Sequence, residues 1–395
     1  MNVKFSTKSL RPARPRLWRC PSRAAPAAAW MNSSSSGAKA SGDSITIGTV
    51  TTNSGTAAAY GEAEVKGFEL AVSEINAKGG INGKKVKLES MDDKGDATEA
   101  SNAYNKLAGD NNVLAVAGPT ISATTAAVAP LADQSKLVTI APAATSDSIE
   151  TGNYLFRTCF KDSYQGEVAA RFAAENLKVK KVAVLYGTGD PYSSGVGEAF
   201  AKAAEKLGLE VVDKESSSSA DDTEYSAQLQ KIQASGAELL YAPYYYSVAG
   251  PYIIPQARSV GFEGYVMGPD GYDGLKLTGD KSQYNKTYYT THYSADDNTN
   301  TKVQDFIKSY KSKNNAEPNT FAALGYDTIY MIKQAIEKAG KNATREDVRN
   351  AVASMTFDGV TGKFTMDESG SPTKSVIVLE MKDGKPVYNT TVQPK

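Results

Sequence analysis

Short β-branched segments alternate with longer amphipathic segments from Ser44 onward, and this alternation limits the possible folds of the chain more than any other feature. Such an order is typical of parallel sheets joined by crossover helices. The predicted strands lie at 45–50, 85–91, 113–117, 137–140, 181–186, 210–212, 239–241 and 265–267. The predicted helices lie at 63–76, 166–176, 195–207, 223–234, 301–312 and 326–339. The pattern predicts an α/β fold with two consecutive strand–helix series, over 44–159 and 160–293, followed by a helical stretch and a C-terminal hairpin.

The first 42 residues differ from the rest of the chain in charge. They carry eight Lys and Arg side chains and no acid, so the other 353 residues hold 36 basic and 44 acidic side chains. Residues 1–30 lack the apolar core of a secretory signal, and residues 32–42 are small and polar, as in a flexible tether. We therefore expect residues 1–43 to form a disordered leader. An acidic body without a basic stripe argues against nucleic acid as a partner.

The residue combinations that most enzymes need are missing from the body. His292 is the only histidine of the chain, and Cys159 is the only cysteine after Cys20, so no metal-ligand spacing occurs. No G-x-S-x-G elbow is present. The loop 187–189 resembles a dinucleotide loop, but Tyr192 stands where the third glycine would be. We expect a binding protein without a cofactor, and not an enzyme.

Loops that follow the predicted strands are candidate ligand sites, because doubly wound sheets bind ligands beyond the carboxyl ends of their strands. Ser122 lies in the loop after 113–117 and is placed to cap a helix, whose free N–H groups favour an anion. The loop after the next strand contains Ala143 and Thr145, and its small side chains let a ligand approach the main chain. An ordinary helix cap and an ordinary turn explain these residues equally well.

Charged and aromatic side chains lie in three further loops. Asp270 follows the strand at 265–267 and could pair with an ammonium group or form an Asx turn. The tyrosines at 244–246 follow another strand, and Tyr60 precedes the first predicted helix. These rings could cover an aliphatic ligand side chain or pack locally.

In combination, these motifs resemble the type I periplasmic binding proteins, in the branched-chain amino-acid (Leu/Ile/Val) branch that serves ABC importers. The matching stretches are IGTVTTNSGTAAAYGEAEVKGFELAVSEINAKGGINGKKVKLESMDD, VAGPTISATTAAVAPLAD, VTIAPAATS, PYSSGVGEAF, IIPQARSVGFEGYVMGPDGYDG, GYDTIYMIKQAIEKAG and GVTGKFTMDESGSP. The resemblance implies two Rossmann-like lobes with central parallel sheets, joined by a three-crossover hinge. Lobe 1 is expected to hold residues 44–160 and 295–372, and lobe 2 residues 161–294 and 373–395.

By motif position, the resemblance also implies a set of ligand contacts. Those expected on lobe 1 are Tyr60 for the ligand side chain, and Ser122, Ala143 and Thr145 for the α-carboxylate and ammonium. Those expected on lobe 2 are Asp270 for the ammonium, with Tyr192 and Tyr245 beside the cleft. Tyr246 is an alternative to Tyr245, because the segment 247–256 is one residue longer than the usual spacing. Many relatives carry Glu where this chain has the shorter Asp270, whose removal should abolish binding with little loss of stability.

The function implied by the resemblance is that of a receptor that closes its lobes around a small amino acid and delivers it to a membrane permease with ATPase subunits. Leucine, isoleucine or valine is the expected ligand, and the receptor is expected to be a monomer. Another amino acid, or an amide, urea or an aromatic acid, is an alternative ligand. A sensor built on the same fold is an alternative function, although no output element is apparent.

Receptors of this kind act outside the cytoplasmic membrane, as a periplasmic protein or a cell-surface lipoprotein. The segment 32–43 resembles the linker that follows a lipoprotein cysteine, whereas Cys20 follows Arg19 and lacks a lipobox. Our hypothesis is that residues 1–30 come from a shifted reading frame or a wrong start codon.

Overall fold

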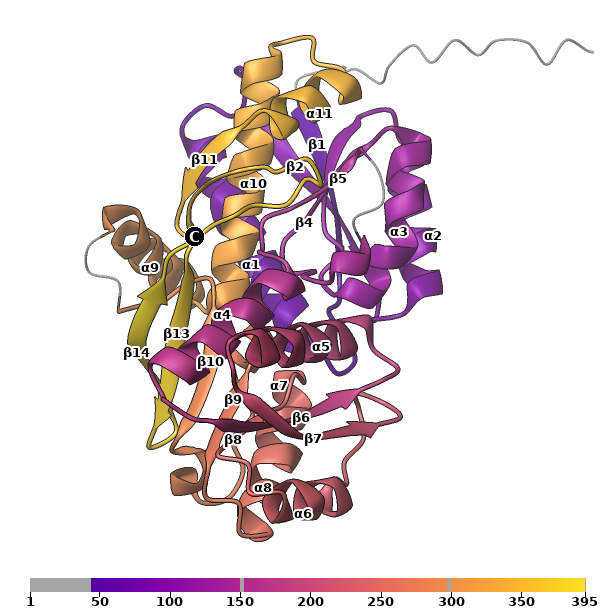
Figure 1. Ribbon diagram of the computed structural model, residues 1–395. Helices are drawn as coiled ribbons and strands as arrows, with labels where there is room; N and C mark the ends of the chain where they lie inside the picture. The colour runs from indigo at the N-terminus through magenta and orange to yellow at the C-terminus, as the bar shows by residue number, and fades with distance from the viewer. Residues whose placement is uncertain (1–43, 150–152, 297–299, 395) are drawn as a thin grey trace, which may run out of the picture. The chain divides into compact units, whose positions relative to one another are not determined.

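The alternation of strands and helices extends through residues 44–149, 153–296 and 300–394, which the computed structural model describes (Figure 1). The leader expected over 1–43, with Cys20, lies outside the described residues. The chain from Ser44 onward builds two large sheets and one two-stranded hairpin.

The first sheet has five parallel strands in the order β2-β1-β3-β4-β5. Their bounds are β1 Ser44–Thr51, β2 Lys85–Asp92, β3 Val113–Ala117, β4 Val138–Ala141 and β5 Leu155–Arg157. All five residues of β3 are buried, as expected for a central strand that is covered on both faces. The helices that pack around this sheet are α1 Ala58–Ala77, α2 Ala97–Gly109, α3 Ser122–Ser135, α9 Thr301–Asn314, α10 Thr320–Ala339 and α11 Arg345–Ala353. The short helix η1 Asp147–Ile149 and the hairpin β11 Thr356–Gly359 and β12 Gly362–Thr365 complete this part.

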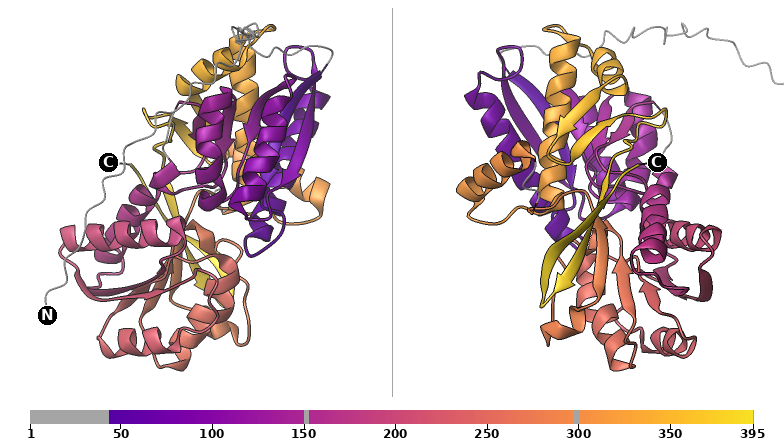
Figure 2. Two further views of the ribbon diagram at one scale, coloured as in Figure 1. Left: turned by 90° about the vertical axis from the view of Figure 1, so that its right-hand side faces the viewer. Right: turned by 60° about the vertical axis from the view of Figure 1, so that its left-hand side comes forward.

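The second sheet has seven strands in the order β14-β13-β10-β9-β8-β6-β7. Their bounds are β6 Lys181–Gly187, β7 Glu210–Ser217, β8 Leu239–Tyr241, β9 Tyr265–Gly268, β10 Thr287–Thr291, β13 Val376–Lys382 and β14 Lys385–Val392. Neighbours from β7 to β10 are parallel, whereas the C-terminal hairpin β13–β14 adds to β10 in the antiparallel sense (Figure 2). The helices of this part are α4 Asp162–Glu175, α5 Pro191–Lys206, α6 Ser226–Ala234, α7 Tyr246–Val248, η2 Ala249–Ile253, α8 Ile254–Ser259, η3 Asp270–Tyr272 and η4 Lys281–Tyr284.

Strand β6 shows how the sequence builds a sheet that is covered on both faces. Val182 and Val184 point into the core shared with α4 and α5, whereas Ala183 and Leu185 point into the core shared with α6 and α8. Successive residues of a strand point to opposite faces, so an uninterrupted apolar run serves both cores.

Helices α1 and α10 cross closely beside the first sheet. This crossing joins the N-terminal segment of the chain around that sheet to the C-terminal segment that returns to it. A Cβ atom at Gly67 would lie 2.2 Å from the carbonyl oxygen of Ala322, and one at Gly325 would lie 2.6 Å from that of Glu64. Only glycine lets the two backbones approach this closely. The glycines therefore set the distance between the helices.

The chain passes between the two sheets three times, after β5, after β10 and after β12 (Figure 1). We call the parts around the first and second sheets lobe 1 and lobe 2. The residues at which the lobes were expected to divide stay a prediction.

The segment expected to be one residue longer than usual contains a π-helical turn. Residues 246–259 run as α7, then the π turn Ala249–Ile253, then α8. A π turn takes one more residue than an α turn. A π turn at this place can accommodate a segment that is one residue longer than usual.

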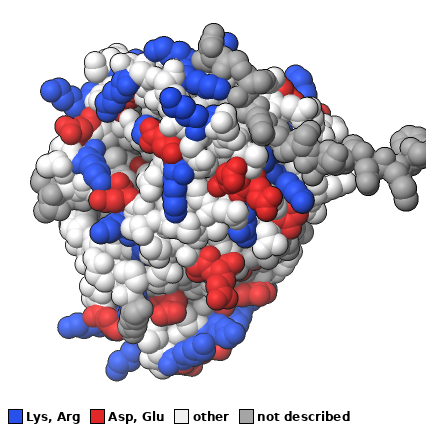
Figure 3. All heavy atoms as spheres, turned by 90° about the horizontal axis from the view of Figure 1, so that it is seen from above, with Lys and Arg blue, Asp and Glu red and all other residues white. Residues whose placement is uncertain are grey.

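Charged side chains of both signs are interspersed on the described part of the face shown in Figure 3, and no stripe of one sign crosses it. Among residues 44–149, 153–296 and 300–394, no helix is long and apolar enough to cross a membrane. In the same residues, His, Cys, Asp and Glu side chains form no group of three or more that could hold a metal ion.

Candidate functional site

A small cavity lies between the lobes, at the carboxyl ends of the strands of both sheets. Its free volume is only about 10 Å³, so the two lobes are packed closely together around it. It is lined by Tyr60, Thr120, Ile121, Ser122, Ala143, Tyr192, Tyr245, Asp270, Gly271 and Phe321. Six of the eight residues expected at the site therefore meet here, and Thr145 and Tyr246 do not line the cavity.

Two stacked pairs of rings form the apolar wall of this cavity. Tyr60 of α1 stacks on Phe321 of α10, with ring centroids 3.9 Å apart. Tyr192 of α5 stacks on Tyr245, with ring centroids 5.2 Å apart and ring planes 5° from parallel. Each lobe thus contributes one pair, and together they suit an aliphatic ligand side chain.

Tyr60 also ties the two lobes together. Its hydroxyl donates to the carbonyl oxygen of Gly271 over 2.5 Å and accepts from the N–H of Tyr246 over 3.0 Å. The hydroxyl of Tyr246 in turn accepts from the N–H of Ala59. Burial raises the pKa of Tyr60 well above its usual value, so the phenol stays a donor. Tyr246 therefore holds the Tyr60 ring that lines the cavity and does not line it itself.

Ser122 occupies a different place in its helix from the one expected. It is the first residue of α3, and the cap position belongs to Ile121, whose side chain makes no capping hydrogen bond. The prediction of a Ser122 cap was therefore wrong. The Ser122 hydroxyl instead accepts from the N–H of Ser146 over 3.1 Å, which joins the start of α3 to the loop after β4. The N-terminus of this 14-residue helix lies at the cavity and favours negative charge.

Arg157 holds the loop that contains Thr145. Its guanidinium Nη1 donates to the carbonyl oxygens of Ala144, Thr145 and Ser146, at 3.2, 2.8 and 3.1 Å. With three carbonyls turned towards a buried cation, the loop backbone has a fixed orientation. The Thr145 carbonyl also accepts from the N–H of Asp162, and its side chain is fully buried. Thr145 therefore joins the loop to α4, outside the cavity.

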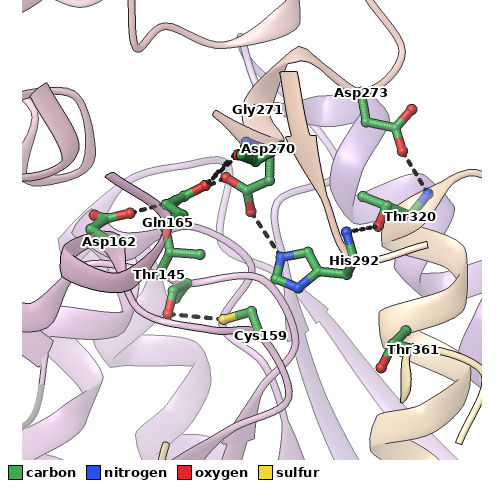
Figure 4. A network of polar contacts seen from close by, with 12 residues as sticks. Thr145, Cys159, Asp162, Gln165, Asp270, Gly271, Asp273, His292, Thr320 and Thr361 are labelled. Atoms are coloured by element: carbon green, nitrogen blue, oxygen red, sulfur yellow. Dashed lines mark hydrogen bonds and ion pairs between the residues drawn. The ribbon is translucent and has the colours of Figure 1, made fainter. Parts of the chain in front are cut away.

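Asp270 of η3 presents the one carboxylate that lines the cavity among the residues that the structure describes, and it is 2% exposed. Its Oδ1 accepts from the Tyr192 hydroxyl over 2.9 Å and from Gln165 Nε2 over 3.3 Å. Its Oδ2 lies 3.2 Å from His292 Nε2 (Figure 4). Among the described residues its side chain contacts Tyr192, Gln165 and His292, all outside its own turn, so the Asx-turn alternative does not describe this residue.

Asp162 of α4 is a second buried carboxyl near Asp270. The amide of Gln165 donates to Oδ1 of both, at 2.7 Å for Asp162 (Figure 4). Burial, and then the charge of Asp270, raise the pKa of Asp162 well above its usual value. Asp162 therefore keeps its proton more readily than a carboxyl in water.

Sequence reasoning missed several residues of the site. Phe321 lines the cavity from the start of α10, and Thr120, Ile121 and Gly271 are neighbours of expected residues. Gln165 and His292 hold Asp270 from α4 and from the residue directly after β10. Because β10 runs parallel to β9, the rule that selected Asp270 would also have selected His292, had β10 been recognised as a strand.

Comparison with known proteins identifies the family of this fold and cavity. The sequence profile described as "Periplasmic binding protein" matches residues 44–386. The chain is a type I periplasmic binding protein. Its similarities place it in the branched-chain amino-acid family of these proteins. Family membership implies a location outside the cytoplasm.

Two curated relatives of this periplasmic binding protein are similar over most of their length. "Leu/Ile/Val-binding protein homolog 3" of Brucella melitensis is 31% identical over 352 residues, 86% of this chain and 92% of the relative. The "Leucine-, isoleucine-, valine-, threonine-, and alanine-binding protein" of Pseudomonas aeruginosa is 30% identical over 333 residues, 83% and 87% of the two chains. The relatives are substrate-binding proteins by name.

A solved structure shares both the fold and a third of the sequence. The branched-chain amino acid transporter substrate binding protein LivJ of Streptococcus pneumoniae, in complex with isoleucine, is 32% identical, with a TM-score of 0.82. The match covers 89% of this chain and all of the other. The α/β fold in two lobes that the sequence predicted is therefore confirmed.

Proposed function

We propose that this protein captures a branched-chain amino acid between its lobes and delivers it to the membrane permease of an ABC importer. The single observation that carries the proposal is the cavity between the lobes, which has a buried carboxylate, Asp270, on one side and a helix N-terminus on the other. The ammonium group of an amino-acid zwitterion can pair with Asp270, and its carboxylate can lie at the helix N-terminus.

The helix α3 and the loop after β4 are the proposed site for the α-carboxylate. The first-turn N–H groups of α3 carry partial positive charge, and Ser122 adds a hydroxyl at the cavity. Ala143 lines the same side and leaves room for the ligand to reach the main chain. Arg157 fixes this loop from behind, through Thr145.

Asp270 is the proposed partner of the ammonium group. A carboxylate only accepts hydrogen bonds, and the structure buries Asp270 with Tyr192, Gln165 and His292 around its two oxygens. A buried charge is costly without a partner of opposite sign. A ligand with an amine meets this requirement, whereas benzoate or another simple acid does not.

The aromatic pairs are proposed to select the ligand side chain. Tyr60, Phe321, Tyr192 and Tyr245 offer ring faces and edges, and no Lys or Arg lines the described cavity to pair with an acidic side chain. Leucine, isoleucine and valine match this surface. The names of relatives that bind these amino acids support the same choice.

Closure of the lobes is the proposed mechanism. The contacts of Tyr60 with Gly271 and Tyr246 form only when the lobes meet. A ligand that touches both lobes favours that state to the extent that it binds it more tightly than the open one. The closed surface is the one that a permease would recognise. We place the monomer in the periplasm or, tethered through its leader, on the cell surface.

Calorimetry on the full chain, freed of bound ligand by reversible unfolding, tests the proposal. A panel of leucine, isoleucine, valine, threonine and alanine is compared with glutamate, urea and benzoate. We expect saturable binding of the branched-chain members, with glutamate and benzoate undetected. Binding of benzoate or urea without any amino acid would refute the proposal.

A further inference from the structure

The only histidine of the chain lies against the carboxylate that faces the cavity. His292 directly follows β10, next to the strand that leads into Asp270, and its imidazole is fully buried. Nε2 lies 3.2 Å from Asp270 Oδ2, and the ring stacks on Phe160 with centroids 3.6 Å apart. Figure 4 shows the imidazole pointing at the carboxylate from the side away from Gln165.

The two oxygens of Asp270 are held by different groups. Tyr192 and Gln165 both donate to Oδ1, whereas His292 is the one partner of Oδ2 in the part of the chain that the structure describes. Because a carboxylate only accepts, Nε2 carries the proton in this contact. Without the His292 imidazole, the carboxylate of Asp270 can therefore rotate and move Oδ2, because only Oδ1 is still held by Tyr192 and Gln165.

His292 also connects this carboxylate to the crossing between the lobes. Its backbone N–H donates to Thr320 Oγ1 over 3.3 Å, and the Thr320 N–H donates to Asp273 Oδ2 over 2.8 Å (Figure 4). Thr320 begins α10 of lobe 1, whereas Asp270 and Asp273 belong to lobe 2. The orientation of Asp270 is thus fixed from a segment that connects the lobes.

We propose that His292 is a positioning residue for ammonium recognition, which holds Oδ2 of Asp270 in the orientation that the ligand amine meets. The inference rests on the proposed function, since it names a residue that acts on the ligand through Asp270. His292 does not line the cavity and therefore does not touch the ligand itself.

The first test measures leucine affinity by calorimetry in four variants. His292→Phe keeps the ring on Phe160 and removes the donor, and it should weaken leucine binding about 10- to 100-fold. His292→Gln keeps a donor and should remain within about fivefold of the wild type. Tyr293→Phe is the matched control, because the Tyr293 hydroxyl has no hydrogen-bond partner in the described structure. In an Asp270→Asn background, His292→Phe should change affinity less than about twofold.

The inference would be overturned if His292→Phe lowered leucine affinity by the same factor in the wild-type and the Asp270→Asn backgrounds. It would also be overturned if His292→Phe alone left leucine affinity unchanged.

A second test needs no ligand. Because the chain has one histidine, its ¹⁵N-imidazole NMR spectrum reports His292 alone, and we expect the Nε2–H tautomer with resonances that move in Asp270→Asn. The Nδ1–H tautomer, or resonances insensitive to Asp270→Asn, would refute the inference even in a protein that binds no amino acid. Absence of amino-acid binding in the wild type refutes the proposed function instead.

Discussion

The guanidinium of Arg157 donates to the carbonyl oxygen of Thr145 over 2.8 Å, and the same nitrogen reaches the carbonyls on either side. One buried side chain therefore sets the backbone of the loop that is proposed to face the ligand carboxylate. The sequence predicted this loop as part of the ligand site, but it did not indicate that Arg157 orients the loop.

Arg157→Met should weaken both stability and affinity. We expect a loss of about 3 kcal/mol in the free energy of unfolding, because three buried carbonyls lose a charged donor. Leucine affinity should fall by a factor of about ten or more, since the loop that Arg157 holds faces the proposed carboxylate site. Urea unfolding and calorimetry measure these effects, with Arg349→Met, a partly buried arginine that does not line the cavity, as control. Unchanged leucine affinity in Arg157→Met would contradict the assignment.

Tyr60→Phe should shift the protein towards the open state. The substitution removes the donor to Gly271 and leaves the Tyr246 N–H without its acceptor, at a cost of about 1–3 kcal/mol to the closed state. Leucine affinity should fall about 5- to 100-fold, and small-angle X-ray scattering should show a larger radius of gyration without ligand. Tyr225→Phe, which removes a hydroxyl without a partner in the described structure, should change neither. Equal scattering for wild type and Tyr60→Phe would disprove the bridging role.

Asp270→Ala should abolish amino-acid binding and also reduce stability. The sequence suggested that this carboxylate supports little besides the ligand, but it accepts from Gln165 and Tyr192 and contacts His292. Loss of these buried bonds should cost about 2 kcal/mol. Asp270→Asn keeps an acceptor and should cost less stability while losing at least about 100-fold in leucine affinity. Full stability in Asp270→Ala would show that these bonds contribute nothing.

The stability contributed by His292 should depend on pH. Burial, and then the charge of Lys374, lower the pKa of His292 from 6.5 to about 4, against the opposing effect of Asp270. Between these values the unfolded chain binds a proton that the folded chain does not, so stability falls as the pH falls from 6.5 towards 4. The free energy of unfolding of the wild type, minus that of His292→Gln, should drop by about 3 kcal/mol between pH 7 and pH 4. The subtraction cancels the other titrating groups, and a constant difference would rule out the shift.

Gly67→Ala should destabilise lobe 1 by about 1–3 kcal/mol, because the new methyl group would meet the Ala322 carbonyl at the crossing of α1 and α10. Gly109→Ala is the matched control, since a Cβ atom there meets nothing within 4 Å. Thermal unfolding of both variants measures the difference. A stable Gly67→Ala variant would mean that the two helices separate without cost.

Strands with a continuous apolar run could be located from the sequence alone. The predicted strands 113–117 and 239–241 have the bounds of β3 and β8, because glycine, proline or polar residues flank each run. Strand β10 has the sequence TYYTT, and it was missed although all five residues are buried. Threonine and tyrosine give no apolar alternation, so its burial follows from its place between β9 and β13.

The start of α1 shows a second limit of prediction from the sequence, which concerns helix ends that are set by contacts with the other lobe. The helix begins at Ala58, five residues before the predicted start, because its first turn faces lobe 2 through Tyr60 and packs its Gly61 against Thr52. The residues of the candidate site were predictable from the sequence to a similarly limited extent. Loops after strands pointed to Ser122 and Asp270, whereas Phe321 and Gln165 reach the site only through the packing of helices.

The C-terminal hairpin has a consequence for how the chain acquires its structure during synthesis. β10 pairs with β13, so until residues 376–382 emerge from the ribosome it remains an unpaired edge of five residues that are buried in the finished protein. Nascent chains that end before Val376 should therefore associate through this edge or be captured by chaperones. The order of synthesis therefore makes β13 the strand on which completion of the second sheet depends.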